Sequence, residues 1–376
     1  MPNKITTKQA YTLFMLAAFS PLISQTSAMG ARLGGRTGWL SLFISCAAFY
    51  GLIALFCIYF RRSKNTDLYS LYKSAFGKII AKILVLIYAV WVFLLAGFYL
   101  QAFSEKFTGL IMPGVPAGFF TITLLALVYI ILSGRFQSFA ILSNICFYVA
   151  LLAIAVIFLL QIPQIKPQNL LPVTQFDVPN IMQGVLPTLG IFAYITPLLF
   201  LGGEIVRDDV PGVPFRKYGL YSAGTLLAVN IIIFMTTVGV FGKDLTAQME
   251  QPFLMSVKTV GAQGALERLE SVFLLLWVVT DLAIIVMLMH ILLKLLGFIA
   301  GRGAGFAPIK ALLIVGVYAL AQILVVSEML GLRVNLVMGF GVPVVAVVIY
   351  MFKTSFSKTP SKPDTPSTTR KPPLPD

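Results

Sequence analysis

A single aspartate inside a long apolar run is the residue whose type and position most clearly indicate chemistry. Asp281 lies within residues 267 to 297, a stretch rich in Leu, Ile, Val and Met. An ionisable side chain at the centre of a membrane helix costs roughly 2.5 to 3.5 kcal/mol even by insertion scales, so it is by default a functional residue. The carboxylate could attract an amine, bind a cation or carry a proton. The alternative is a protonated or hydrogen-bonded acid that faces Thr280 or a buried water.

Two residues near Asp281 share one face of the expected helix. Thr280 and Ile284 stand four residues apart, the spacing that places side chains one above the other on an α-helix. These side chains could line a ligand site. Simple packing against another helix is the alternative interpretation.

Proline residues predict that two other apolar runs are interrupted helices. Pro187 and Pro197 lie within residues 184 to 204, and Pro21 lies in the middle of the first apolar run. Proline removes a backbone donor and clashes with the carbonyl four residues earlier, so each helix should open or bend there. In a membrane, opened backbone survives only where other helices or a polar cavity receive it. Two simple kinks without a site are the alternative.

The backbone at these interruptions could bind a zwitterion. Free amides after Ser20 would favour a carboxylate, and carbonyls released between Phe192 and Ile195 would favour an ammonium group. An amino acid carries both groups, so we expect a ligand of this kind. Ordinary helix packing is the alternative for each residue. The predicted ligand contacts, partly through backbone atoms, are Ser20, Leu22, Phe192, Ala193, Tyr194, Ile195, Thr280, Asp281 and Ile284.

No catalytic or metal-binding constellation accompanies these positions. The sequence contains one histidine, His290, and three cysteines that lie apart within apolar runs. One histidine cannot build most acid/base or metal chemistry, and the chain lacks G-x-S-x-G and P-loop motifs. His290, with Lys294 four residues later, is expected at the membrane interface. We therefore expect neither an enzyme nor a cofactor, a metal site or a disulfide framework.

The composition is that of an integral membrane protein. Of the 376 residues, 58% are hydrophobic and 11% are charged, and the mean hydropathy is +0.91. A soluble domain of this composition would have an unacceptably apolar surface, so lipid must surround most of the chain. The net charge of +14 comes from basic residues in short loops and in the tail. This distribution is typical of loops beside anionic lipid and disfavours nucleic-acid binding.

The hydropathy pattern predicts an all-α membrane domain over residues 1–352 and a disordered cytoplasmic tail over residues 353–376. The longest polar connection is Gly242 to Gly264. The tail is predicted to be disordered because its composition changes to Lys, Ser, Thr and Pro. About ten transmembrane helices are expected, at residues 9–31, 37–60, 80–104, 116–134, 141–161, 181–204, 218–241, 267–297, 308–328 and 333–353.

The loop charges predict the orientation of the ten helices. The side that would hold both termini carries 20 Lys and Arg residues, and the other side carries 8, among them Lys106. The positive-inside rule therefore places both termini in the cytoplasm.

The two interrupted helices are the first and the sixth of the ten. Because they stand five apart, the second set of five helices enters the membrane from the opposite side to the first. This relation is the signature of a five-plus-five inverted repeat with a ligand site at the midplane.

Several short motifs carry a resemblance to known families. Phe192 to Tyr194 is similar to the FFAF or FFAY stretch of amino acid/polyamine/organocation transporters. Four further motifs stand in the order seen in the spore germination permease family, the B subunits of GerA-type nutrient receptors. These motifs are Phe241-Gly242, the proline-bearing Gln251 to Leu254, Glu267 to Ser271, and Trp277. Further matches are Ile5-Thr6 with Gln9, Gly38-Trp39 and Leu170 to Val173, so that the resemblance spans residues 5 to about 350.

This resemblance implies a fold, a function and partners. The fold would be the LeuT-like transporter fold, and the function would be nutrient sensing in the inner membrane of a spore, which triggers germination. The implied partners are the receptor's A subunit and its lipoprotein C subunit. An amino acid permease with coupled transport is the alternative function, and a structural subunit that conducts ions or water is the third. Residues 140 to 160 contain no Lys or Arg that could stand in for sodium in the fifth helix.

Overall fold

The structure is a computed structural model that describes residues 4–63, 67–112, 114–173, 177–205, 213–261, 268–300, 307–323 and 328–356. Its secondary structure over these ranges is helical, apart from one isolated parallel bridge between Ile5 and Ile205. The α-helices are α1 (Thr7–Pro21), α2 (Ser27–Gly34), α3 (Gly38–Arg62), α4 (Leu68–Phe76), α5 (Lys78–Lys106), α6 (Ala117–Ser133), α7 (Phe136–Gln161), α8 (Val178–Phe192), α9 (Ile195–Leu198), α10 (Val213–Phe241), α11 (Lys243–Gln248), α12 (Pro252–Gly261), α13 (Arg268–Ala300), α14 (Ala307–Ile323), α15 (Glu328–Leu336) and α16 (Val342–Phe356).

Seven helical segments within the described ranges are long and apolar enough to cross a membrane. The first, Thr7–Arg62, has 56 residues and includes α1, α2 and α3, which are the segments expected to form two crossings. Ala117–Ser133 and Pro308–Ile323 are shorter apolar helices. The all-α membrane architecture is therefore confirmed, and the number of crossings stays a prediction.

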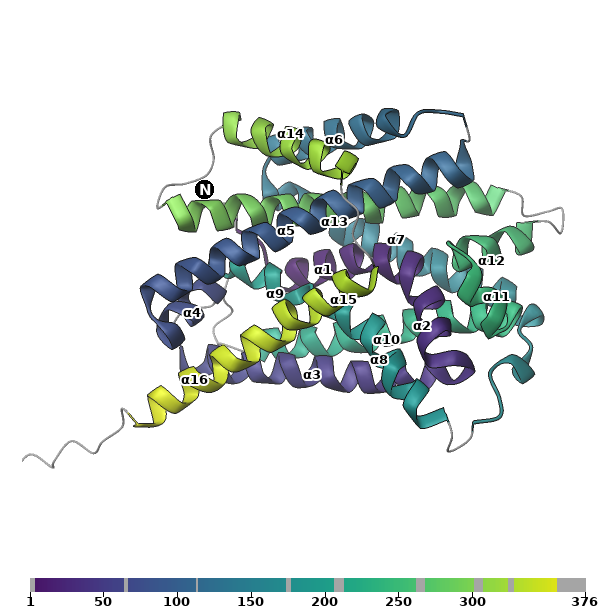
Figure 1. Ribbon diagram of the computed structural model, residues 1–376, viewed down its shortest axis with the longest axis horizontal. Helices are drawn as coiled ribbons and strands as arrows, with labels where there is room; N and C mark the ends of the chain where they lie inside the picture. The colour runs from purple at the N-terminus through teal and green to yellow at the C-terminus, as the bar shows by residue number, and fades with distance from the viewer. Residues whose placement is uncertain are drawn as a thin grey trace, which may run out of the picture.

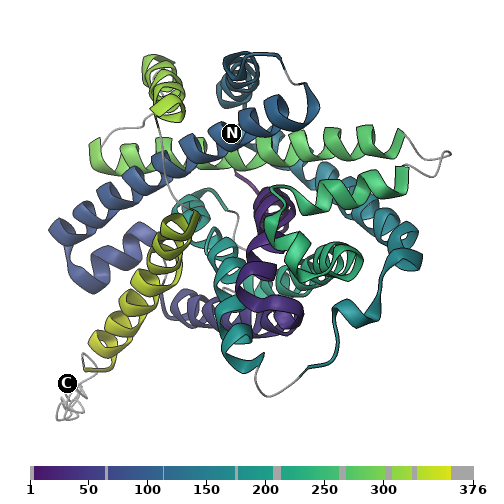
Figure 2. The ribbon, with the colours of Figure 1, turned by 45° about the vertical axis from the view of Figure 1, so that its right-hand side comes forward.

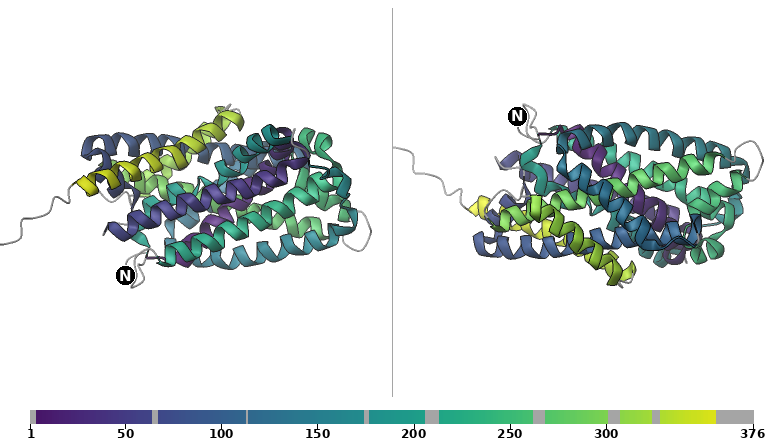
Figure 3. Two further views of the ribbon diagram at one scale, coloured as in Figure 1. Left: turned by 90° about the horizontal axis from the view of Figure 1, so that it is seen from below. Right: turned by 90° about the horizontal axis from the view of Figure 1, so that it is seen from above.

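The bundle surrounds α1 and the α8–α9 segment (Figure 1). Helices α5 and α13 pack against each other, and α6 and α14 lie on their outer side (Figures 1 and 2). Helices α3 and α10 lie on the opposite side of α1 and pack on each other. The helices follow the long axis of the molecule, and the start of α1 and the end of α16 lie at the same end (Figure 3).

The segment Val178–Glu204 is the centre of the fold. Within its most apolar window 89% of the residues are buried, against 61% for the next most buried candidate span. Helix α8 ends at Phe192, Ala193 and Tyr194 form a turn, and α9 starts at Ile195. The predicted interruption between Phe192 and Ile195 is thus confirmed, and it divides the segment into α8, α9 and a 3-10 helix, Leu199–Glu204.

The first helix is also interrupted at the predicted place, but in a different form. A π-helical turn, Leu22–Thr26, joins α1 to α2. The Leu22 N–H donates to the carbonyls of Ala18 and Phe19, so the expected half-helix with free amides after Ser20 is absent from this described segment. The physical reason is local compensation, because the Ser24 hydroxyl donates to the Ser20 carbonyl (2.9 Å) and the Thr26 hydroxyl to the Leu22 carbonyl.

Two short helices occupy the longest polar connection, where the sequence predicted none. They are α11 and α12, and α11 packs against α2. At the other end of the chain, α16 continues to Phe356, four residues into the predicted tail. The remainder of that tail, residues 357–376, lies outside the described residues.

Candidate functional site

Asp281 forms a buried ion pair with a lysine from another helix. The Lys106 Nζ lies 2.9 Å from the Asp281 Oδ2, and the two side chains are 8% and 3% exposed. The Ser20 hydroxyl donates a hydrogen bond to the other carboxylate oxygen, Oδ1. These three residues, the buried triad, join α5, α13 and the C-terminal end of α1.

The Lys106 ammonium also contacts an aromatic ring. Its Nζ lies 4.5 Å from the centre of the Trp277 ring, which comes from α13 one turn before Asp281. A desolvated cation over a tryptophan face is stabilised by the ring quadrupole. The Trp277 indole N–H is buried and has no hydrogen-bond partner among the described residues. A donor is therefore available beside the triad.

Helical geometry explains why Trp277 and Asp281 both contact the Lys106 ammonium. Residues four apart lie one above the other on a helix, so both side chains face α5. Lys106 is the last residue of α5, and the side chains of a helix point back toward its N-terminus, which directs the long lysine stem into the protein. The Coulomb attraction of the pair offsets the cost of burying two charges only while both partners are present.

Thr280 and Ile284 lie next to the triad in sequence but do not take part in it. The Thr280 hydroxyl donates to the Trp277 carbonyl of its own helix (2.8 Å), so it does not serve Asp281. Both residues are buried, with Thr280 at 1% and Ile284 at 0% exposure. The hydrogen-bonded acid facing Thr280, which was the structural alternative, is therefore replaced by an ion pair with Lys106.

A second polar network starts at the interruption of the α8–α9 segment. The Tyr194 hydroxyl shares a hydrogen bond of 2.6 Å with the Tyr99 hydroxyl of α5. The Asn335 Nδ2 donates to Tyr194 (2.9 Å), and the Trp91 Nε1 donates to the Asn335 Oδ1 (2.9 Å). This network therefore joins the α8–α9 turn to α5 and α15.

A third interrupted helix packs on the same turn. The π-helical turn Val337–Gly341 lies between α15 and α16, and the Thr196 hydroxyl donates to the carbonyl of its Gly339 (2.6 Å). A Cβ atom at Gly339 would lie 2.2 Å from the Ala193 Cβ. Only a glycine allows this approach of the two backbones.

The remaining predicted contacts, Leu22, Phe192, Ala193 and Ile195, are at most 1% exposed. The Phe192 ring packs on the Phe49 ring with 4.8 Å between centroids. The backbone of the turn is hydrogen-bonded: the Ala193 carbonyl accepts from the Thr196 N–H (3.1 Å). The structure thus brings Ser20 into direct contact with Asp281, whereas Leu22, Phe192, Ala193 and Ile195 are buried in the packed interior of the protein.

Sequence reasoning missed Lys106, although a signal for it existed. The third helix was expected to end at residue 104, which assigned Lys106 to an outer loop. The signal was Asp281 itself, because a buried carboxylate needs a cationic or hydrogen-bonding partner. The roles of Tyr99 and Asn335 were also missed, and no motif in the sequence marks them.

His290 lies in a separate charged cluster near the far end of α13. Its Nε2 is 3.6 Å from the Glu204 Oε2, and the Lys294 Nζ is 2.8 Å from the Glu204 Oε1. The Ile5 N–H donates to the Glu204 carbonyl (2.9 Å), so this cluster fastens the start of the chain to the end of the 3-10 helix. The His290 ring stacks on Phe136 with 3.9 Å between centroids.

The overall fold has a clear structural relative. The crystal structure of MhsT in complex with L-phenylalanine matches with a TM-score of 0.67 over 92% of this chain and 89% of the other, at 14% sequence identity. This likeness confirms the predicted all-α, LeuT-like transporter fold, and the number of ten helices stays a prediction. A comparison with curated proteins finds no match.

A family assignment comes from the sequence of the chain. The family model described as "Spore germination protein" matches residues 4–306, which include the buried triad and both interruptions. The match covers well over half of the chain. The protein therefore belongs to the spore germination protein family of membrane permeases.

Proposed function

We propose that the chain is the nutrient-sensing subunit of a spore germinant receptor and that its ligand is an amino acid. The observation that carries this proposal is the buried triad of Lys106, Asp281 and Ser20, which lies between three helices of a transporter fold. Intramembrane charges of this kind mark substrate or ion pathways.

The charges of the triad match those of a zwitterion. An amino acid's ammonium group would engage the Asp281 carboxylate, and its carboxylate would engage the Lys106 ammonium. The unpartnered Trp277 N–H supplies a further donor for the ligand carboxylate. MhsT, which shares the fold, was crystallised with L-phenylalanine. In this proposal the positive and negative groups that bind the ligand are the side chains of Lys106 and Asp281. They replace the free backbone amides and carbonyls that the sequence suggested.

The other proposed contacts surround these poles. Ser20 holds the carboxylate that the ligand would share, and Tyr194 links the α8–α9 turn to α5. The proposed ligand-contacting residues remain Ser20, Leu22, Phe192, Ala193, Tyr194, Ile195, Thr280, Asp281 and Ile284, to which the geometry adds Lys106 and Trp277.

Ligand binding would act by shifting a conformational equilibrium. Because the triad ties α1 and α5 to α13, a ligand that replaces its internal bonds would favour a state in which these helices separate. We propose that the A subunit and the lipoprotein C subunit of the receptor sense this change in the spore inner membrane. Both termini would face the cytoplasm, consistent with the shared end of α1 and α16.

A germination screen tests the proposal. Spores that lack this protein are complemented with the wild-type gene and exposed to single amino acids; at least one should trigger germination only in complemented spores. Asp281→Asn should abolish that response, whereas Asp244→Asn, whose side chain is 85% exposed, should keep it at equal protein levels. An absence of any amino acid response that depends on the protein would overturn the proposal.

Coupled amino acid transport is the second candidate function, and the fold shared with MhsT favours it. Labelled amino acid uptake into vesicles separates the two functions. A receptor should bind the amino acid without substantial accumulation, whereas a permease should accumulate it against a gradient.

A further inference from the structure

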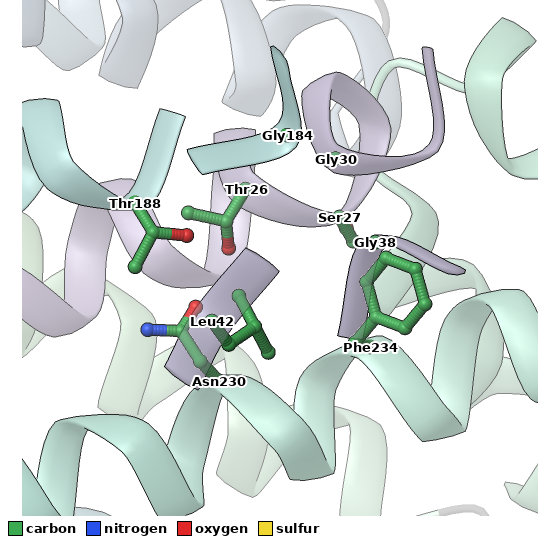
Figure 4. A pocket seen from close by; sticks show the side chains of 9 residues that line it. All are labelled: Thr26, Ser27, Gly30, Gly38, Leu42, Gly184, Thr188, Asn230 and Phe234. Carbon is green, nitrogen blue, oxygen red and sulfur yellow. The ribbon is translucent and has the colours of Figure 1, made fainter. Parts of the chain in front are cut away.

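A small polar cavity lies beside the π-helical turn of the first helix, apart from the buried triad. Four polar side chains line it: Thr26 and Ser27 at the start of α2, Thr188 of α8 and Asn230 of α10. The cavity volume is about 10 Å³, which is close to the space that one water molecule requires. Figure 4 shows the side-chain oxygens of Thr26, Thr188 and Asn230 turned toward the space between them.

The hydrogen bonds of these groups are incomplete. Among the described residues, the buried Ser27 hydroxyl has no hydrogen-bond partner and the Thr188 hydroxyl makes no hydrogen bond. The Thr26 hydroxyl donates to the Leu22 carbonyl, and the Asn230 Nδ2 donates to the Leu226 carbonyl (3.1 Å). The cavity therefore faces two unused hydroxyl donors and the free acceptor capacity of Thr26 and Asn230.

We propose that this cavity binds one ordered water molecule, which joins the first, sixth and seventh membrane helices. A water accepts from the hydroxyls of Ser27 and Thr188 and donates to the oxygens of Thr26 and Asn230, which satisfies all four groups. A cation fits less well because it cannot accept a hydrogen bond and because none of the residues that line the cavity is charged.

Close backbone contacts keep the cavity small. A Cβ atom at Gly184 would lie 2.5 Å from the Ser41 hydroxyl oxygen and 3.0 Å from the Gly34 Cα. A Cβ atom at Gly38 would lie 2.8 Å from the Phe234 ring. The walls therefore hold α2 and α8 close enough for one water to reach both, at the point where the first helix changes its winding.

Radiolytic hydroxyl-radical footprinting of the purified full-length protein tests this site. A bound water generates radicals next to the side chains that it touches, so Phe234, which is 3% exposed, should be oxidised several-fold faster than the equally buried Phe56, at 1%. Equal, low rates at the two rings would show a dry cavity and overturn the proposal. This comparison needs no variant, so misfolding cannot obscure it.

A matched pair of variants localises the water. Thr188→Val, which removes one hydroxyl at nearly constant volume, should reduce the oxidation of Phe234 several-fold. Thr237→Val removes a buried hydroxyl of α10 that bonds within its own helix (2.7 Å) and should leave Phe234 unchanged. Equal effects of the two variants would contradict the site.

A Phe234 oxidation rate that changes when choline replaces sodium at constant ionic strength would identify a cation and also overturn the water assignment.

Discussion

At the residue scale, Lys106 and Asp281 show how a membrane protein stabilises charges in its interior. Each is buried, and each has a partner within 2.9 Å. Each partner needs the other, because an isolated charge in an apolar interior is strongly disfavoured. The packing of α5 against α13 therefore depends in part on this one ion pair.

Removing the lysine charge should destabilise the protein. Lys106→Met keeps most of the apolar stem but leaves Asp281 without its cation, so we expect a loss of about 3 to 5 kcal/mol in the free energy of unfolding. Thermal unfolding of the purified protein in detergent or nanodiscs measures this loss. Lys243→Met is the control, since Lys243 is 53% exposed and should change stability by less than about 0.5 kcal/mol. Similar melting of the two variants would show that the buried pair contributes little.

The Trp277 N–H should matter for the nutrient response more than for stability. Trp277→Phe keeps an aromatic face under Lys106 but removes the unpartnered donor, so the nutrient concentration for half-maximal germination should rise several-fold. The unfolding temperature should change less than in Lys106→Met. An unchanged germination response would exclude the indole N–H from the ligand site.

At the element scale, the prolines predicted where two helices are interrupted but not how. Pro187 and Pro197 flank a turn at Ala193 and Tyr194, as expected. At Pro21 the chain instead widens into a π-helical turn, since nearby hydroxyls bond the released carbonyls. Which form appears depends on side chains one turn away and on packing, and a proline pattern does not contain that information. The π-helical turn at Val337–Gly341 carries Pro343 just beyond it, and the sequence did not reveal it.

The packing of that turn on the α8–α9 interruption should be intolerant of any side chain. Gly339→Ala would place its Cβ 2.8 Å from the Ala193 Cα as well as against the Ala193 Cβ, so the backbones must separate. Overpacking of this kind costs roughly 1 to 3 kcal/mol. Gly341→Ala is the control in the same turn, because its Cβ would meet nothing within 4 Å. Thermal unfolding of both variants should show a clear loss only for Gly339→Ala, and equal losses would refute the close approach.

At the scale of the whole molecule, the sequence predicted the architecture better than the site. Hydropathy and the spacing of interrupted helices gave a five-plus-five bundle, and the fold is confirmed. Hydropathy and helix spacing do not predict which side chains of different helices contact each other. Lys106 and Asp281 stand 175 residues apart, and Tyr99 and Tyr194 stand 95 apart, so only the packed bundle brings them together.

The bundle also explains why a small local change could reach the whole molecule. The triad joins α1, α5 and α13, and the tyrosine network joins α5 to the α8–α9 turn and α15. The first interrupted helix is thus bonded to α13 through Ser20, and the α8–α9 turn is bonded to α5 through Tyr194. A ligand that replaced the internal bonds of the triad would release contacts in both halves of the fold at once.

Binding by the purified protein tests the central claim most directly. The unfolding temperature of the full-length protein in nanodiscs is measured with the proteinogenic L-amino acids, one at a time, and with the amide of any that binds. The account predicts that at least one amino acid raises the unfolding temperature of the wild type, that its amide, which lacks the carboxylate, has little effect, and that Asp281→Asn abolishes the rise. An amino acid that stabilised the wild type and Asp281→Asn equally, or the failure of every amino acid to stabilise the wild type, would contradict it.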